Sequence, residues 1–189
     1  MNRVIYCFWF GPEMSDNRKK CFESIIQNSK VGVRLVTKHN LQEYNLADSP
    51  IHPAFQYLSA THKSDYLRCY FMYHYGGGDT DIKYYDYDWN KYFDMFESSD
   101  KQFIGYPELS PLDIAYVQAQ HLFKSMIGNG AYIFKPKTPF AKVWLDEVNQ
   151  KMDSISEELK LHPGDYHPRA IKGGIQGIQE NGDSKRSEE

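Results

Sequence analysis

Three consecutive glycines at residues 76–78 constrain the fold of this chain more than any other feature of its sequence. Because glycine has no Cβ, the backbone there reaches positive φ angles and allows other groups to approach closely. Residues 63–75 before the glycines have the spacing of an amphipathic helix, and Asp79, Thr80 and Asp81 follow them. In a strand, residues two apart project to the same side. The pattern predicts a helix, a glycine hinge and a strand end whose two carboxylates face one ion.

A second pair of ionic residues lies on the expected helix. Asp65 and Arg68 are three residues apart and therefore share a helix face, while Leu67 and Phe71 fall on the side that packs inward. Such a pair is often only a solvated ion pair worth roughly 0.2–0.5 kcal/mol, and two aspartates near glycines often form a turn. Their combination with the glycine hinge in one short run favours a ligand site.

The rival use of closely spaced aspartates is a calcium-binding loop. That loop needs a third oxygen ligand, a glycine at its sixth place and a glutamate at its twelfth. Counted from Asp79, these places hold Lys83, Tyr84 and Asn90, so the sequence excludes such a loop.

Strand-like and helix-like segments alternate along the chain. The apolar run at residues 4–10 ends at a Gly-Pro breaker and reads as a buried strand, a helix follows at 14–28, and a strand at 31–37 completes a β-α-β unit. Further strands are expected around 79–81, at 102–106 and at 131–134, and further helices at 41–44, from 53, and at 63–75, 89–96, 121–126 and 139–160. This alternation predicts an α/β fold with a mostly parallel sheet and helices on both faces. In such folds ligands bind beyond the carboxyl ends of strands, where residues 10–11 and Asp81 are expected.

The composition excludes several classes of protein. The chain has 189 residues, of which 41% are hydrophobic and 25% charged, which suits one domain with a core. A net charge of −3 gives no reason to expect nucleic-acid binding, and the basic residues 18–20 read as a solvated helix face.

Three cysteines without a Cys-x-x-Cys pair indicate neither a zinc site nor a disulfide framework, which favours a cytoplasmic location. The apolar run at 4–10 is far shorter than the roughly 20 residues of a membrane span, so no transmembrane segment is expected, and peripheral association with a membrane stays open.

The run from residue 64 to residue 81 resembles the glycosyltransferases that carry the DXD sugar-binding region, and most closely the bacterial capsular polysaccharide synthesis proteins. Residues 6–11 resemble the first strand of that family, and residues 128–136 are similar to its later strand near the acceptor pocket. The resemblance covers about residues 1–170 and implies one GT-A-like, Rossmann-like domain there. It implies that the nucleotide-sugar donor is bound by Phe8, Trp9, Phe10, Gly11, Asp65, Arg68, Gly77, Gly78, Asp79 and Asp81. It also implies metal contact by Asp81 first and Asp79 second, with Mn²⁺ or Mg²⁺ as cofactor, and it puts Gly128 and Asn129 on the acceptor side.

Two departures from the family limit what is carried over. In much of the wider family two more residues separate the glycines from the acidic pair, so a second alignment places Asp81 first and Lys83 where the second carboxylate stands. Asp81 keeps its role in both alignments. Residues 171–189 are polar and glycine-rich, which predicts a disordered tail, and they do not match the further segment with which the family continues. The resemblance therefore also predicts a C-terminally truncated chain.

The activity that the resemblance implies is a metal-dependent, retaining hexosyl transfer. The donor is a nucleoside diphosphate sugar, with a UDP-sugar favoured, and the acceptor is a capsular or other cell-surface glycan. A divalent ion would stabilise the charge of the departing diphosphate. Asp65 would accept hydrogen bonds from ribose or base, and Arg68 would offset phosphate charge or orient Asp65. The sequence names no catalytic base, and two alternatives stay open: a truncated nucleotide-binding domain without turnover, and an α/β module whose carboxylates form a solvated turn.

Overall fold

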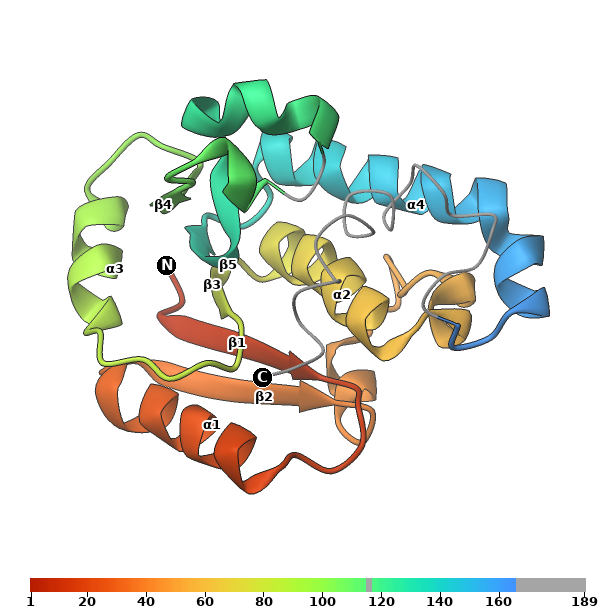
Figure 1. Ribbon diagram of the computed structural model, residues 1–189, viewed down its shortest axis with the longest axis horizontal. Helices are drawn as coiled ribbons and strands as arrows, with labels where there is room; N and C mark the ends of the chain where they lie inside the picture. Colours follow the sequence, from red (N-terminus) through yellow and green to blue (C-terminus); the bar gives the residue numbers. More distant parts are fainter. Residues whose placement is uncertain (115–116, 166–189) are drawn as a thin grey trace.

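A computed structural model of the chain describes residues 1–114 and 117–165. These residues form a five-stranded sheet in the order β2-β1-β3-β5-β4, with helices packed on it (Figure 1). The expected tail at residues 171–189, and the end of the expected domain at residue 170, lie outside the described residues.

The chain begins with the expected β-α-β unit. Strand β1 (Val4–Trp9) leads into helix α1 (Asp16–Asn28), and strand β2 (Gly32–Thr37) returns parallel to β1. Helix α1 begins after Ser15, whose hydroxyl accepts a hydrogen bond from the Arg18 backbone amide at 3.2 Å. A serine in this position satisfies one of the free amides at a helix start, which explains the boundary.

Strand β3 joins β1 on the edge opposite β2. Two short 3-10 helices, η1 (Leu41–Tyr44) and η2 (Pro53–Tyr57), lead to helix α2 (Ala60–His74) and then to β3 (Gly77–Thr80), which is parallel to β1. The expected glycine hinge is confirmed at its first two positions, since Gly76 has φ +61° and Gly77 has φ +86°. The hinge turns the chain directly from α2 into β3.

The second half of the sheet differs from the expectation of a mostly parallel sheet. Helix α3 (Trp89–Glu97) precedes β4 (Phe103–Pro107), the 3-10 helices η3 (Pro111–Asp113) and η4 (Val117–Ser125) follow, and β5 (Ile127–Phe134) leads into α4 (Pro139–Leu161). Strand β5 runs antiparallel to both β3 and β4, so the sheet is parallel only across β2, β1 and β3. Antiparallel neighbours need no helical crossover, and the segment expected to be a helix at 121–126 is the end of the 3-10 helix η4.

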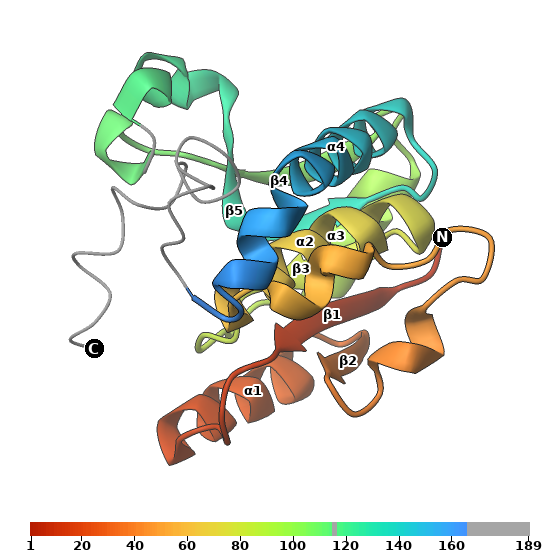
Figure 2. The ribbon, with the colours of Figure 1, turned by 90° about the vertical axis from the view of Figure 1, so that its right-hand side faces the viewer.

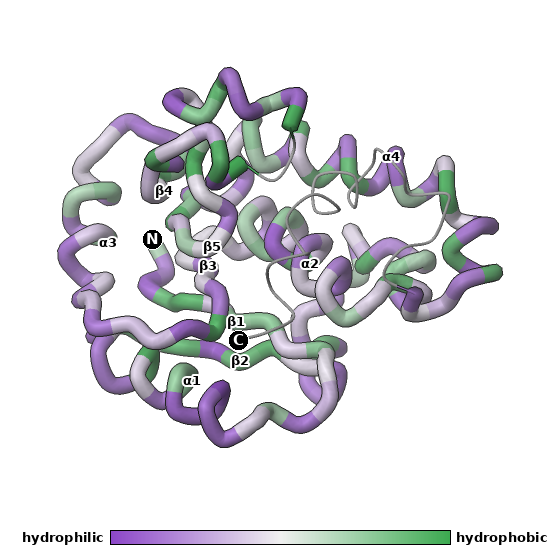
Figure 3. Tube along the Cα trace, viewed as in Figure 1, coloured by the Kyte–Doolittle hydropathy of each residue, from purple (hydrophilic) through white to green (hydrophobic). Residues whose placement is uncertain are grey.

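Helices cover both faces of the sheet, as the alternation of side chains along β1 predicts. Tyr6 and Phe8 point into a core shared with α2 and α4, and Ile5 and Cys7 point into a second core shared with α1 and α3. Figure 2 shows α1 on one side of β1 and α2 and α4 on the other. Along α4, hydrophobic and hydrophilic residues alternate in the manner of a helix that packs by one face (Figure 3).

Within residues 1–114 and 117–165, no helix reaches both the length and the hydropathy that a bilayer span requires.

Candidate functional site

The candidate site lies where the strand order reverses. From β1 the chain passes through α1 to β2 on one side, and the next connection, through α2, places β3 on the other side of β1. Helices α1 and α2 pack on opposite faces of the sheet, so a crevice is expected between the carboxyl ends of β1 and β3. Trp9 ends β1, and Asp81 directly follows β3.

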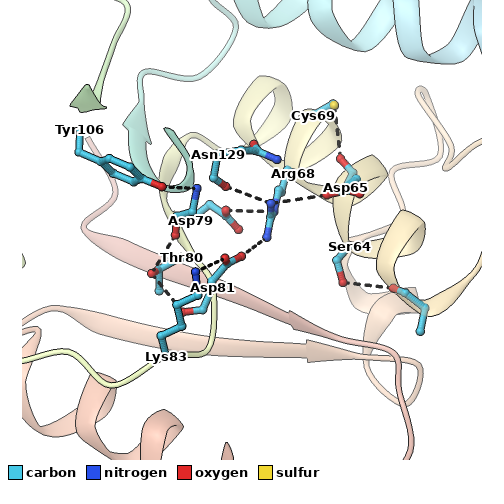
Figure 4. A network of polar contacts seen from close by, with 12 residues as sticks. Ser64, Asp65, Arg68, Cys69, Asp79, Thr80, Asp81, Lys83, Tyr106 and Asn129 are labelled. Carbon is cyan, nitrogen blue, oxygen red and sulfur yellow. Dashed lines mark hydrogen bonds and ion pairs between the residues drawn. The ribbon is translucent and has the colours of Figure 1, made fainter. Parts of the chain in front are cut away.

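The guanidinium of Arg68, on α2, is the centre of a polar cluster at the end of β3 (Figure 4). Its Nη1 donates to the backbone oxygen of Asn129 at 3.0 Å and lies 3.5 Å from Asp65 Oδ1. Its Nε lies 3.3 Å from Asp79 Oδ2, and its Nη2 donates to Asp81 Oδ1. Arg68 and these four partners are called the Arg68 cluster below. The cluster joins α2, β3 and β5 through one side chain.

The carboxyl group of Asp79 is the most enclosed member of the Arg68 cluster. Its residue is 0% exposed, and the polar groups that act on it are the Arg68 guanidinium and the buried Tyr132 hydroxyl. Burial raises the pKa of Asp79 to about 7, against the opposing effect of the Arg68 charge. Close to neutral pH this group therefore exchanges a proton.

Asp81 has the opposite electrostatic setting. Burial alone would raise its pKa, but Arg68 and Lys83 together hold the pKa of Asp81 below its ordinary value. Lys83 Nζ lies 3.1 Å from Asp81 Oδ2, and the side chains of Asp81 and Lys83 are 22% and 55% exposed. Asp81 is therefore an ionised carboxylate that a ligand can reach, with a cation at each of its two oxygens.

Arg68 itself stays charged in this setting. Burial disfavours its charge, yet Asp79 and Asp81 keep the pKa of Arg68 well above its ordinary value. Most of the N–H groups of the guanidinium already face a carboxylate or the Asn129 carbonyl. Arg68 is therefore well placed to hold the side chains of Asp65, Asp79 and Asp81 in position.

The expectation that Asp79 and Asp81 face one metal ion does not fit this geometry. Both carboxylates face the guanidinium of Arg68, and Asp79 has no exposed surface. Within residues 1–114 and 117–165, no group of three or more His, Cys, Asp or Glu side chains is arranged to hold a metal ion. The use of Mn²⁺ or Mg²⁺ stays a prediction that only a binding measurement tests.

Phe8, Trp9, Phe10 and Gly11, which the family resemblance implies as donor-binding residues, point in two directions. Phe8 lies in the core with its ring centroid 5.0 Å from that of Phe71, and the Phe10 ring packs edge-on against Phe55 at 5.8 Å. Trp9 and Gly11 line an open cavity of about 560 Å³ between the ends of β1 and β2 and the start of α1. The strand alternation thus brings only two of the four to this cavity.

Arg18 lies between Trp9, which lines the cavity, and the loop that follows β3, a position that the sequence did not predict. Its guanidinium donates to the Ile82 carbonyl, in the loop after β3, and lies 6.0 Å from the centroid of the Trp9 ring. The basic run at residues 18–20 predicts a solvated helix face, which holds for Lys19 and Lys20 but not for the half-buried Arg18. The position of Arg18 in the sequence could have indicated this placement. It lies in the first turn of α1, and the first turn of a helix that follows a parallel strand lies at the carboxyl end of the sheet.

Gly77 and Gly78 serve the packing of β3. A Cβ on Gly77 would lie 2.6 Å from the Val4 carbonyl oxygen, and one on Gly78 would lie 3.0 Å from the Trp89 ring. These two glycines therefore allow β1 and α3 to pack closely against β3.

Gly128 and Asn129, expected on the acceptor side, line a second cavity of about 340 Å³ between β5 and α4. The Tyr106 ring covers Gly128 so closely that a Cβ would lie 1.9 Å from it. The same cavity is lined by Trp144 and Glu147 of α4. Asn129 belongs to both this cavity and the Arg68 cluster, so the two adjoin.

The comparison with known families concerns the part of the chain that builds β1, α1, β2, α2 and β3. Residues 1–81 match the family model described as capsular polysaccharide synthesis protein. The matched segment contains Asp65, Arg68 and Asp79 and ends at Asp81. Lys83, Asn129 and the cavity beside α4 lie beyond it. No curated protein and no solved structure matches the chain.

Proposed function

We propose that this protein is a glycosyltransferase that moves a hexosyl unit from a nucleoside diphosphate sugar to a capsular or other cell-surface glycan. One observation carries the proposal. The acidic and basic side chains of the Arg68 cluster lie at the reversal of strand order, within the segment that matches capsular polysaccharide synthesis proteins. This is the place where open α/β sheets bind nucleotides.

The cavity at the end of β1 is the proposed nucleoside site. Its volume of about 560 Å³ lies in the range of small-molecule sites, roughly 300–1,000 Å³. Trp9 offers a ring on which a base stacks, and Arg18 leads from that ring to the loop after β3. A donor bound here has its base at Trp9 and its diphosphate near Asp81, with UDP as the favoured nucleotide.

In this proposal Asp65 accepts a hydrogen bond from the ribose or base, and Arg68 is a positioning residue. The side chains of Asp65 and Arg68 are each 12% exposed, so a ligand in the crevice reaches their edges. Because Arg68 already contacts three carboxylates, its main effect is to orient them rather than to bind phosphate alone.

The cavity between β5 and α4 is the proposed acceptor site. Trp144 supplies an aromatic surface and Glu147 a carboxylate that accepts hydroxyl hydrogen bonds, and sugars offer matching groups for both. Retention at the anomeric carbon, the truncated C-terminus, a cytoplasmic location and a peripheral membrane association stay predictions, and no catalytic base is assigned.

Calorimetric titration with UDP tests the proposal directly. We expect the parent protein to bind UDP and Asp65→Ala to bind it at least tenfold more weakly, which is about 1.4 kcal/mol. Asp100→Ala is the matched control, because the Asp100 side chain is 90% exposed and lies outside the cluster. Equal affinity in the parent and Asp65→Ala would contradict the site assignment.

A panel of nucleoside diphosphate sugars separates transfer from binding alone. A transferase releases the nucleoside diphosphate from one donor of the panel, and much faster when its glycan acceptor is present. Binding of UDP without release from any donor would instead favour the truncated nucleotide-binding domain without turnover.

A further inference from the structure

Three cationic side chains from three different elements meet the short segment 81–83 after β3. Arg68 of α2 binds Asp81 Oδ1, and Lys83 Nζ lies 3.1 Å from Asp81 Oδ2. Arg18 of α1 donates to the Ile82 carbonyl. This convergence is not explained by the folding of β3, whose backbone is paired with β1 and β5.

Lys83 is the exposed member of the three. Arg68 is enclosed by three carboxylates, whereas Lys83 contacts Asp81 from the solvent side. The Lys83 side chain is 55% exposed and follows a tight bend, in which its amide donates to the Asp81 carbonyl at 2.9 Å. Its ammonium is therefore the cation of the three that solvent, and a ligand phosphate, can reach most easily.

A divalent ion on Asp81 would compete with these cations. Both oxygens of Asp81 have a cationic partner, and Asp79 is buried against Arg68. With all three aspartates ionised, the negative charges of Asp65, Asp79 and Asp81 are balanced by the positive charges of Arg18, Arg68 and Lys83, and protonation of Asp79 leaves the group net positive. No excess negative charge is therefore left to attract a doubly charged ion. Displacing Arg68 would also leave buried carboxylates without a partner, which is strongly unfavourable.

We propose that Lys83, supported by Arg18, supplies the positive charge for the diphosphate of the donor, and that nucleotide binding at this site needs no divalent ion. The inference rests on the proposed function, because it assigns a role to the same donor site. Lys83 stands where the second alignment with the family places a carboxylate. In this chain an ammonium stands at that position, and it acts as a compact charge that donates to phosphate oxygens.

The experiment is calorimetric titration with UDP in EDTA and, separately, in MnCl₂. We expect the parent affinity to agree within about twofold between the two buffers, and Lys83→Ala to lose at least tenfold in both, about 1.4 kcal/mol. Lys83→Asp restores an acidic pair with Asp81 and is expected to bind UDP only with Mn²⁺. Lys101→Ala is the matched control, since Lys101 is 71% exposed and lies outside the site.

The outcomes separate this inference from the proposed function. Parent binding that disappears in EDTA, or unchanged affinity in Lys83→Ala, overturns the inference and leaves the transferase proposal standing. A parent that binds UDP in neither buffer overturns the proposed function and the inference with it. Thermal unfolding of each variant confirms that the exposed substitutions leave the fold intact.

Discussion

The Nε of Arg68 on α2 lies 3.3 Å from Oδ2 of Asp79 on β3, and the Asp79 side of this ion pair is closed to water. The same guanidinium reaches Asp81, which is partly exposed. Arg68 thus links a buried carboxylate with one that is partly exposed. A change at either carboxylate is expected to affect both the stability of the fold and the site.

Replacing Arg68 tests how far the cluster stabilises the protein. At pH 8, where Asp79 is mostly ionised in the parent, Arg68→Met removes the charge that balances this buried carboxylate, so we expect a loss of roughly 3–5 kcal/mol in the free energy of unfolding. Urea denaturation measures it. The double variant Arg68→Met/Asp79→Asn should recover part of this loss, because one unbalanced carboxylate is gone. Arg34→Met, at an exposed position on β2, is the control and should change stability little.

Asp79→Asn is expected to change how stability depends on pH. The pKa of Asp79 is raised from 3.8 to about 7 by burial, so between these values the folded protein holds a proton that the unfolded chain has released. The parent therefore loses stability as pH rises through this window, by roughly 2 kcal/mol between pH 5 and pH 8. Asp79→Asn lacks this loss, so the difference between the two proteins should grow with pH. Parallel curves of unfolding free energy against pH would contradict the assignment.

His74 is expected to act in the opposite direction at acid pH. Burial first, and then Lys137, lower the pKa of His74 to about 4, and its ring contacts Ser49 Oγ at 3.1 Å and Lys137 Nζ at 2.8 Å. Below pH 6.5 His74 is protonated in the unfolded chain but stays neutral in the folded protein. The contribution of neutral His74 to the free energy of unfolding is therefore complete above pH 6.5 and is lost as pH falls toward 4. Allowing for partial solvent screening, we expect about 1 kcal/mol.

The variant His74→Gln makes that loss measurable. It should reduce the decline in unfolding free energy between pH 6.5 and pH 4.5, relative to the parent. His39→Gln, at an exposed position after β2, is the control and should follow the parent curve. An identical decline in His74→Gln and the parent would show that His74 does not titrate in this way.

Gly77 is expected to tolerate substitution less well than another glycine with positive φ. Gly164 has φ +78° with open space around a Cβ, so Gly164→Ala should cost only the backbone strain of about 1–2 kcal/mol. Gly77 has φ +86°, and a Cβ there would meet the Val4 carbonyl oxygen at 2.6 Å. Gly77→Ala should therefore be at least about twice as destabilising in urea denaturation. Similar losses in both variants would mean that β1 moves aside at little cost.

The local elements of this protein could be predicted because their signals are local. The apolar run of β1, the serine before α1 and the glycines before β3 each act on their own neighbours in the chain. The two faces of β1 also follow from the alternation of side chains, which is why Trp9 and Phe8 separate. The sequence likewise drew attention to Asp65, Arg68, Asp79 and Asp81 as one group.

The partners of those side chains depend on tertiary structure. Asp79 and Asp81 have the same residue type and lie on one strand end, yet only the packing of α2 and β5 makes the first buried and the second partly exposed. The antiparallel direction of β5 and the reach of Arg18 across the loop after β3 also depend on elements distant in the chain.

The sequence by itself thus determined the order of strands and helices and the run that carries the acidic and basic residues. Only the tertiary structure decided that the two aspartates face a guanidinium, and that Lys83 contacts the second of them from solvent. The physical reason is that secondary structure follows from side-chain periodicity and caps along the chain. The charge state and exposure of a carboxylate follow from how distant segments exclude water and bring cations near it.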